Sequence, residues 1–423
     1  MAHQEIQLLR LATVGSVDDG KSTLIGRLLF DTKGAFEDQL HAVRKQKGKE
    51  GISSGKDIDL AMLTDGLQAE REQGITIDVA YRYFSTPKRK FIMADCPGHE
   101  QYTRNAITGA STANVAVILL DARKGILPQT RRHTHIVSLL GIPHLVVAIN
   151  KMDLVDYDQQ TFESIRDDLR AYCAEQGIQD LICIPVSALE GDMVVKRGDK
   201  MPWYEGNTVL NTLEKIEVSN HITEQDMRFP VQLVVRPQSE EYHDYRGFAG
   251  RIASGSMHVG DDVVALPSGK SSKIKEITTF DGNLQSAFAP QSVTVVLEDE
   301  IDLSRGDMLV PKAALPTSTK QLTAMICWMG EEPLQKRKKY LLKNNSNTVK
   351  VMVDEIVSRT NIQTLEGESG VDTLAVNDIG QVSFKLMQEM HVDDYKVIRA
   401  TGSVIVIDSF SNATVGAGMI QLN

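Results

Sequence analysis

One run of residues near the start of the chain has the composition of a phosphate-binding loop. It follows the pattern Gly-x-x-x-x-Gly-Lys-Ser and consists of Gly15, Ser16, Val17, Asp18, Asp19, Gly20, Lys21 and Ser22. Backbone N–H groups must wrap around phosphate oxygens, so glycine is needed where the chain turns tightly, and a following helix adds its positive dipole end. Lys21 would neutralise the β- and γ-phosphates, and the Ser22 hydroxyl would coordinate Mg²⁺. The loop predicts a nucleoside triphosphate as ligand.

A second motif, made of Asn150, Lys151, Met152 and Asp153, is suited to reading the base. Guanine presents two adjacent donors, N1–H and the 2-amino group, and the Asp153 carboxylate can accept both. With adenine the same carboxylate would be buried and unpaired, which costs about 2–5 kcal/mol. A further group can offer backbone N–H donors to guanine O6, namely Ser187, Ala188 and Leu189. Together with the phosphate loop, these motifs favour GTP.

Two further elements could sense the γ-phosphate. The first is Asp95, Cys96, Pro97 and Gly98, in which Asp95 can hold Mg²⁺ through water and the Gly98 N–H can contact the γ-phosphate. The second is Thr76, whose hydroxyl can complete the Mg²⁺ shell. Both contacts disappear when the γ-phosphate leaves, which predicts a nucleotide-dependent switch.

His99 is the candidate catalytic residue. A single histidine is more often a surface or packing residue, but His99 directly follows Gly98, which places it beside the attacking water. We therefore favour a water-orienting role. Asp18 and Asp19 either tune the phosphate loop or are simply solvated, and the sequence does not distinguish these alternatives.

The elements that must position these residues alternate between buried strands and amphipathic helices up to about residue 219. Apolar runs at 8–14, 91–94, 115–120, 145–149 and 182–185 predict strands, and helical patterns cover 22–30, 130–140 and 160–176. This alternation is typical of a mostly parallel sheet with helices on both faces. Ligands of such folds bind at the carboxyl ends of the strands, where the motifs above are found.

The second half of the chain has a different pattern, with short β-branched runs separated by turn residues. The runs lie at 229–235, 263–266, 293–297, 349–353 and 404–407. Short strands at regular spacing predict all-β domains. We expect an α/β P-loop G domain at 1–219, followed by two β-barrel domains at 228–314 and 318–423, joined near residues 311–317.

Composition excludes several classes of protein. The chain has 423 residues, is 42% hydrophobic and 24% charged, and has no apolar stretch long enough to cross a bilayer. Its four cysteines lie far apart in the sequence, without metal-ligand spacing, and predict free thiols in a reducing cytoplasm. No secretory signal is visible at the start.

A net charge of -10 argues against a protein that coats nucleic acid. Two local basic runs, 44–49 and 336–339, favour solvated surface over a nucleic-acid patch. The polar segment 31–74 is either a surface insertion or a region that orders against a ligand or partner.

From about residue 8 to residue 419, the chain resembles the GTPase (large) subunit of the heterodimeric bacterial sulfate adenylyltransferases. The resemblance rests on dense matches at 15–29, 36–40, 65–84, 95–105, 246–250 and 412–419. That family is in turn similar to translation elongation factors, with which it shares a G domain and two β-barrels.

The resemblance implies a function, cofactors and a partner. GTP and Mg²⁺ would be bound here, and a smaller catalytic subunit would form adenylyl sulfate and pyrophosphate from ATP and sulfate. Hydrolysis of GTP by this chain would be coupled to that reaction, with no membrane and no nucleic acid involved. Some members carry a fused kinase domain for adenylyl sulfate, and we expect no such activity because no second phosphate loop precedes Asn423.

Two alternatives belong to other functional classes. The nucleotide motifs would also suit an elongation-factor-like GTPase that delivers aminoacyl-tRNA, and the segments 36–40, 79–84 and 100–105 favour sulfate activation over it. A GTP-regulated scaffold with negligible turnover is the other alternative, and His99 argues against it.

Overall fold

The computed structural model describes residues 7–32, 76–218, 221–237, 245–361 and 364–422. The chain forms two compact units, Met1–Val218 and Ser219–Asn423. The predicted basic run 44–49 and the polar segment from residue 33 onward, including the family match at 36–40 and the start of that at 65–84, lie outside the described residues. We propose 1–219, 228–314 and 318–423 as domain limits.

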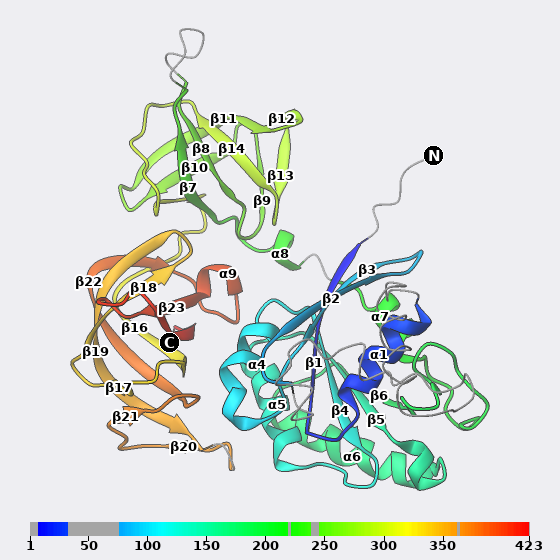
Figure 1. The fold of residues 1–423 in the computed structure, drawn as a ribbon. Helices are drawn as coiled ribbons and strands as arrows, with labels where there is room; N and C mark the ends of the chain where they lie inside the picture. The colour runs from blue at the N-terminus through cyan, green and yellow to red at the C-terminus, as the bar shows by residue number, and fades with distance from the viewer. Residues whose placement is uncertain (1–6, 33–75, 219–220, 238–244, 362–363, 423) are drawn as a thin grey trace, which may run out of the picture. The chain divides into compact units, whose positions relative to one another are not determined.

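The first unit is built on a six-stranded sheet with the order β2-β3-β1-β4-β5-β6 (Figure 1). Every neighbouring pair from β3 to β6 is parallel, and β2 is antiparallel to β3. The strands are β1 (Leu8–Gly15), β2 (Ala80–Ser85), β3 (Lys90–Asp95), β4 (Val115–Asp121), β5 (His144–Asn150) and β6 (Leu181–Pro185). The mostly parallel sheet predicted from the apolar runs is confirmed.

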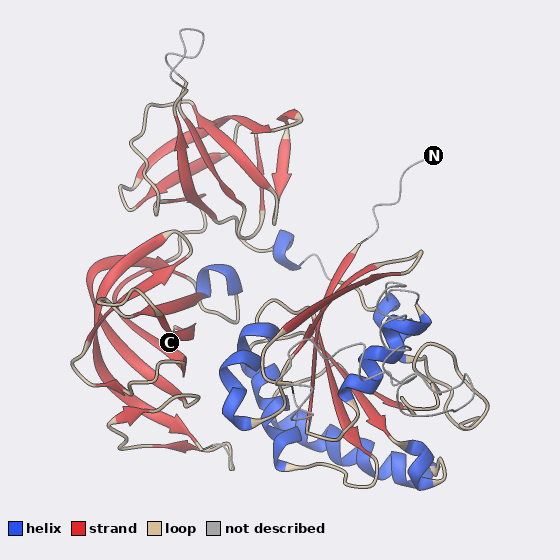
Figure 2. Cartoon of the chain, viewed as in Figure 1, coloured by secondary structure: helices blue, strands red, loops and turns tan. Residues whose placement is uncertain are grey.

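Helices cover both faces of this sheet, with α1 and α7 on one side and α4 and α5 on the other (Figures 1 and 2). They are α1 (Lys21–Asp31), α4 (Thr103–Ala110), α5 (Pro128–Leu139), α6 (Gln159–Glu175) and α7 (Val209–Lys215), with short 3₁₀ turns η2 (Glu100–Tyr102) and η3 (Met152–Val155). Because both faces are covered, all of β4 is buried, which explains its uninterrupted apolar run. The parallel strands β1, β3, β4 and β5 end at one edge, and the predicted motifs follow them there.

The second unit contains two closed antiparallel barrels. In the first, the strand order is β10-β15-β7-β8-β14-β11, and β10 also pairs with β11, which closes the ring. In the second, the order β18-β23-β24-β16-β22-β19 is closed by pairing of β18 with β19. Full closure removes exposed strand edges. The two predicted all-β regions are therefore barrels.

The barrel strands agree with the predicted runs, and residues 312–316 connect the two rings. The first barrel has β7 (Phe229–Val235), β8 (Gly247–Arg251), β10 (Asp262–Leu266), β11 (Lys270–Thr279), β14 (Ser292–Leu297) and β15 (Met308–Pro311). The second has β16 (Thr317–Trp328), β18 (Lys339–Asn344), β19 (Asn347–Thr360), β22 (Ile379–Val392), β23 (Ser403–Ile407) and β24 (Thr414–Gln421). Shorter elements are α8 (His221–Glu224), β9 (Ser256–His258), β12 (Gly282–Leu284), β13 (Ser286–Phe288), β17 (Leu334–Gln335), β20 (Gly367–Glu368), β21 (Thr373–Leu374) and α9 (Arg399–Gly402).

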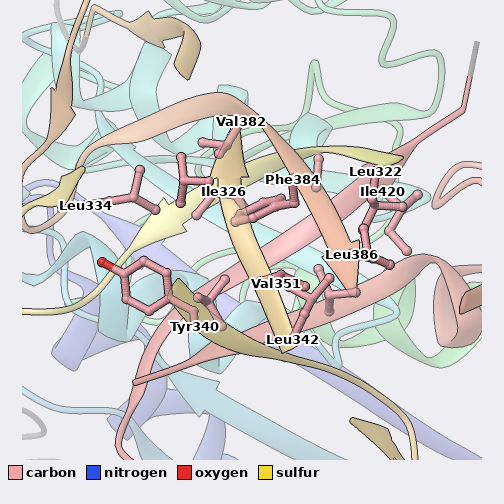
Figure 3. Packing of buried hydrophobic residues seen from close by; sticks show 14 of the residues in the cluster. Leu322, Ile326, Leu334, Tyr340, Leu342, Val351, Val382, Phe384, Leu386 and Ile420 are labelled. Atoms are coloured by element: carbon pink, nitrogen blue, oxygen red, sulfur yellow. The ribbon is translucent and has the colours of Figure 1, made fainter. Parts of the chain in front are cut away.

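The interior of the second barrel is filled by apolar side chains from all around the ring (Figure 3). Phe384, Ile326 and Leu342 are fully buried there, and Trp328 packs edge-on against Tyr340 with ring centroids 5.5 Å apart. Alternating burial along the strands produces this core, because successive side chains point to opposite faces of a sheet.

Two of the four cations in the basic run 336–339 are paired with carboxylates. Lys336 pairs with Asp372 at 3.0 Å, and Lys338 pairs with Glu332 at 2.9 Å. These exposed pairs are those of an ordinary solvated surface, as expected for this run.

Candidate nucleotide site

The phosphate loop leaves β1 at Gly15 and enters α1 at Lys21. Gly20 lies in the left-handed region with φ 90°, and Asp18 has φ 68°. A side chain at Gly20 would also collide with Asn150, because an added Cβ would lie 2.5 Å from the Asn150 amide nitrogen. Glycine is therefore required at this position by both the backbone conformation and the close approach of a second motif.

The predicted cation ligands lie together at the start of α1. The Lys21 ammonium contacts the carboxylate of Asp95 and lies 2.7 Å from the Thr76 hydroxyl. Both Lys21 and Asp95 are buried, so the pair is shielded from solvent. The sequence prediction that Lys21, Thr76 and Asp95 share one site agrees with this arrangement, and Ser22 stands beside Lys21 in the first turn of α1.

The loop after β3 lies directly against the phosphate loop. An added Cβ on Gly98 would lie 1.8 Å from the Gly15 carbonyl oxygen, so only glycine fits there without movement of one loop. The Cys96 N–H donates to the Thr13 carbonyl at 3.0 Å, which fixes the start of this loop to β1. The buried Cys96 thiol has a pKa raised to about 12 by burial and so stays protonated.

His99 precedes the turn η2 and is only partly exposed. The Gln101 N–H donates to His99 Nδ1 at 3.4 Å, a contact that in the neutral ring places the proton on Nε2. An Nε2–H group donates a hydrogen bond, so this ring can orient a water molecule or a phosphate oxygen by donating to it. Proton abstraction at Nε2 would require the other tautomer.

The base-reading residues are held by one another. The Ser187 hydroxyl donates to an Asp153 carboxylate oxygen at 2.6 Å, which orients the carboxylate. The Ser187 N–H donates to the Asp192 carbonyl and the Ala188 N–H to Asn150 Oδ1. Of the three predicted N–H donors for guanine O6, Leu189 is the one for which the described residues provide no acceptor.

Asn150 and Lys151 connect the base-reading residues to the phosphate loop. The Asn150 amide donates to the Asp19 carbonyl at 2.7 Å, while its oxygen accepts from Ala188 at 3.0 Å. The Lys151 ammonium donates to the Asp18 carbonyl and pairs with Asp121 at 3.1 Å. Met152 is fully buried and anchors η3. In this structure the motif connects two loops, and its role in reading the base stays a prediction.

The two aspartates of the phosphate loop have different surroundings. Asp18 is exposed, whereas Asp19 is buried, accepts from the Ser16 N–H at 3.0 Å and has one oxygen without a partner among the described residues. Burial raises the pKa of Asp19 to about 6. The sequence left open whether this residue tunes the phosphate loop or is simply solvated. In the structure Asp19 is not solvated but belongs to the internal hydrogen bonding of the loop.

The neighbouring carboxylate, Asp121, behaves in the opposite way. Burial would raise its pKa, but hydrogen bonds from the side chain and backbone of Arg123 and from Lys151 outweigh that effect. The pKa of Asp121 therefore lies well below its usual range, and the group stays ionised as the anchor for Lys151.

Two arginines around the site were not predicted from the sequence. Arg27 on α1 donates to the carbonyls of Ala188 and Leu189, and so holds the base-reading loop from behind. Arg132 on α5 donates to Glu100 at 3.1 Å, beside His99. Arg27 lies within the family match at 15–29 and Arg132 lies in no motif, but the partners of both are distant in the sequence, so no local signal indicated these contacts.

Comparison with known families agrees with this geometry. Residues 6–225 match the family described as elongation factor Tu GTP binding domain, and residues 321–421 match the family described as GTP-eEF1A C-terminal domain-like. Among solved structures, sup35 complexed with GMPPNP aligns with 98% of this chain and 94% of its own at 20% identity, with a TM-score of 0.45. The family match over residues 6–225, together with the observed barrels, defines the class of protein: it is a GTP-binding protein with an elongation factor Tu-type G domain and two β-barrels.

Curated relatives identify the family more closely. Proteins named sulfate adenylyltransferase subunit 1 from Bacteroides fragilis and Alteromonas mediterranea are each 52% identical over 99% of this chain, covering 86% and 88% of their own lengths. The protein of that name from Chromobacterium violaceum is 54% identical, covering 99% of this chain and 87% of its own length. The chain belongs to the sulfate adenylyltransferase subunit 1 family. Membership supports sulfate activation over delivery of aminoacyl-tRNA.

Two further predictions concerned the state of the cysteines and the absence of a membrane-spanning segment. All four cysteines are free, as predicted. Among the described residues, no helix is both long enough and apolar enough to span a membrane.

Proposed function

We propose that this chain is the GTPase subunit of a sulfate adenylyltransferase, and that it couples hydrolysis of GTP to formation of adenylyl sulfate and pyrophosphate from ATP and sulfate. The observation that carries the proposal is the connection of an oriented Asp153 carboxylate, through Ser187 and Asn150, to the phosphate loop. This arrangement allows one ligand to be read at its base and held at its phosphates. The particular reaction, formation of adenylyl sulfate, is inferred from membership in the family.

The oxygen ligands around Lys21 fit a magnesium ion. Mg²⁺ prefers hard oxygen donors and takes part of its shell from substrate phosphates. Asp95, Thr76 and Ser22 provide one carboxylate and two hydroxyls, and the Lys21 ammonium now lies against the first two. A bound ion would supply charge neutralisation for the phosphates. Because the ion and the ammonium compete for the same oxygens, Lys21 must turn toward the phosphates when both are bound.

Different residues of the chain would bind the phosphates and orient the attacking water. Lys21 and the backbone of the phosphate loop bind the β- and γ-phosphates, and Gly98 offers its N–H to the γ-phosphate. His99 orients the attacking water by donating from Nε2. Most catalysis of phosphoryl transfer comes from positioning and charge stabilisation, and these groups supply both.

Coupling requires a partner. The relatives are named as subunit 1, and we propose that this chain assembles in the cytoplasm with a smaller catalytic subunit that uses ATP and sulfate. A mixed anhydride of phosphate and sulfate is strongly uphill to make from ATP, so a second energy source is needed. GTP and GDP states can provide it only if their affinities for states of the partner differ.

The test is synthesis by the assembled enzyme. We expect adenylyl sulfate to accumulate beyond its GTP-free equilibrium when GTP is supplied, and not when a non-hydrolysable analogue replaces it. Accumulation that is the same with GTP and with the analogue would exclude coupling to hydrolysis. Tight, salt-dependent binding of aminoacyl-tRNA in the GTP state would instead favour the delivery function.

A further inference from the structure

The buried side chain of Arg132 has no role in nucleotide binding described above. It lies on α5 with 7% of its surface exposed, and a buried guanidinium is costly unless its donors are paired. Only Nη2 has an acceptor, and Nε and Nη1 have none among the described residues. Burial of a guanidinium with two unpaired donors is unfavourable, so we asked which contact of Arg132 offsets this cost.

What Arg132 holds is the turn that carries His99. Its Nη2 donates to Glu100 Oε2 at 3.1 Å, and Glu100 is exposed and lies immediately after His99. The backbone of that turn is closed locally, since the Tyr102 N–H donates to the His99 carbonyl at 3.0 Å. The Glu100 side chain therefore ties the turn to α5.

The adjacent residue on α5 supports the same loop in a different way. His133 is buried and forms a hydrogen bond with the backbone of Gly98. Burial, together with the charge of Arg132, lowers the pKa of His133 to about 4, so the ring is neutral near pH 7. The helix thus presents one permanent cation and one neutral ring to Glu100 and Gly98, the residues on either side of His99.

We propose that Arg132 is a positioning residue for GTP hydrolysis, which fixes the orientation of His99 through Glu100. This role rests on the proposed GTPase function. The two unpaired guanidinium donors allow Arg132 to engage both oxygens of Glu100, because a planar guanidinium binds a carboxylate best with two parallel bonds. The bidentate pair would form when the loop closes on GTP, and it would hold His99 in line with the attacking water.

The test compares Arg132→Met with Arg131→Met in the full chain assembled with its partner subunit. Arg131 is the matched control, since it is exposed on the same helix and stacks over Tyr172, 5.3 Å from the ring centroid. We expect Arg132→Met to lower the rate of GTP hydrolysis by about 10- to 100-fold, because small misplacements of catalytic groups have effects of this size. The affinity for GTP should change less than about threefold, and Arg131→Met should hydrolyse GTP as the wild type does.

Three further measurements separate positioning from a structural role. Arg132→Lys should recover part of the rate, since it keeps the charge but not the fork. Glu100→Gln should slow hydrolysis alone and add little in the Arg132→Met background, as expected for a coupled pair. The NMR signal of the His99 imidazole should shift in Arg132→Met and not in Arg131→Met.

Different results overturn different statements. Wild-type rates for Arg132→Met, or an unshifted His99 signal, would exclude the positioning role. An equal loss of GTP affinity and hydrolysis, with full additivity to Glu100→Gln, would reduce Arg132 to a structural residue. Absence of GTP hydrolysis by the wild-type assembled enzyme would overturn the proposed function and the positioning role together.

Discussion

At the scale of single residues, we propose that guanine recognition depends on the Asp153 carboxylate. Its orientation is set by the Ser187 hydroxyl at 2.6 Å, which leaves the other oxygen for the base. Asp153→Asn replaces an acceptor by a donor, so the preference should change from GTP toward xanthosine triphosphate. We expect a loss of about 30-fold or more in GTP affinity from the unmatched polar pair. Titration with both nucleotides checks this, and retained preference for GTP would remove Asp153 as the reader.

A second residue-scale prediction concerns stability and pH. The folded-state pKa of Asp19, about 6, lies above its ordinary value of 3.8. Between these values the folded state binds the proton more readily than the unfolded state, so this group costs stability as pH rises through that window. Asp19→Asn keeps an acceptor for the Ser16 N–H and does not titrate. The free energy of unfolding of Asp19→Asn relative to wild type should therefore increase by about 1–3 kcal/mol between pH 4 and pH 6. Above about pH 7 the difference should stay constant.

Urea unfolding at several pH values measures this difference. The effect of His133, whose pKa is lowered to about 4, has the opposite sign but is present in both proteins and cancels. Asp18→Asn is the matched control, because Asp18 is its exposed neighbour in the same loop. A pH-independent difference between Asp19→Asn and wild type would contradict the assignment.

The sequence was most informative about residues that belong to contiguous motifs. The phosphate loop, the Asp95–Gly98 segment and the Asn150–Asp153 segment are each read from adjacent positions, and the strand ends bring them together. It could not reveal Arg27 or Arg132, because their partners are distant in the chain. Nor could it show that the Ala188 N–H is taken by Asn150, since that depends on how two loops meet.

At the scale of elements, the site depends on backbone contact between two loops. Gly98→Ala would place a methyl carbon 1.8 Å from the Gly15 carbonyl oxygen, so the loop after β3 must move away from the phosphate loop. The proposed N–H contact from residue 98 to the γ-phosphate would be lost. We expect GTP affinity to fall about 10- to 100-fold, the value of a hydrogen bond to a charged group.

Affinity for GDP should change much less, since GDP has no γ-phosphate. Calorimetric titration with both nucleotides checks the difference. Gly367→Ala is the control, because its methyl group would lie 3.6 Å from Ser358, at ordinary contact distance. Equal losses for GTP and GDP would show that Gly98 does not sense the γ-phosphate.

Elements with continuous apolar runs were predictable, and strand β2, which has no such run, was not. Strands β1, β3, β4 and β5 have mostly buried runs because helices cover both faces, and the partly buried strand β6 still has an apolar run. Strand β2 lies at the edge of the sheet, and its Tyr81 and Tyr83 are exposed, so it has no such run. Its alternating burial is a weaker signal, and the segment entered the prediction only through the family resemblance.

At the scale of the whole molecule, the G domain is expected to be a slow enzyme alone. Intrinsic hydrolysis by GTPases of this kind is slow and often depends on a partner's contribution. We expect addition of the catalytic subunit with ATP and sulfate to raise the GTPase rate at least about tenfold. Phosphate release measured with and without that subunit checks the prediction, and identical rates under turnover conditions would contradict coupling.

The central claim, a guanine nucleotide read by Asp153 and held by the Lys21 loop, is tested most directly by calorimetry. The full chain is titrated with GDP and with ADP in the presence of magnesium, which avoids turnover during the measurement. The account predicts that GDP binds about 30-fold or more tightly than ADP, as expected when a buried carboxylate loses its paired donors. Equal affinities for the two nucleotides would contradict it.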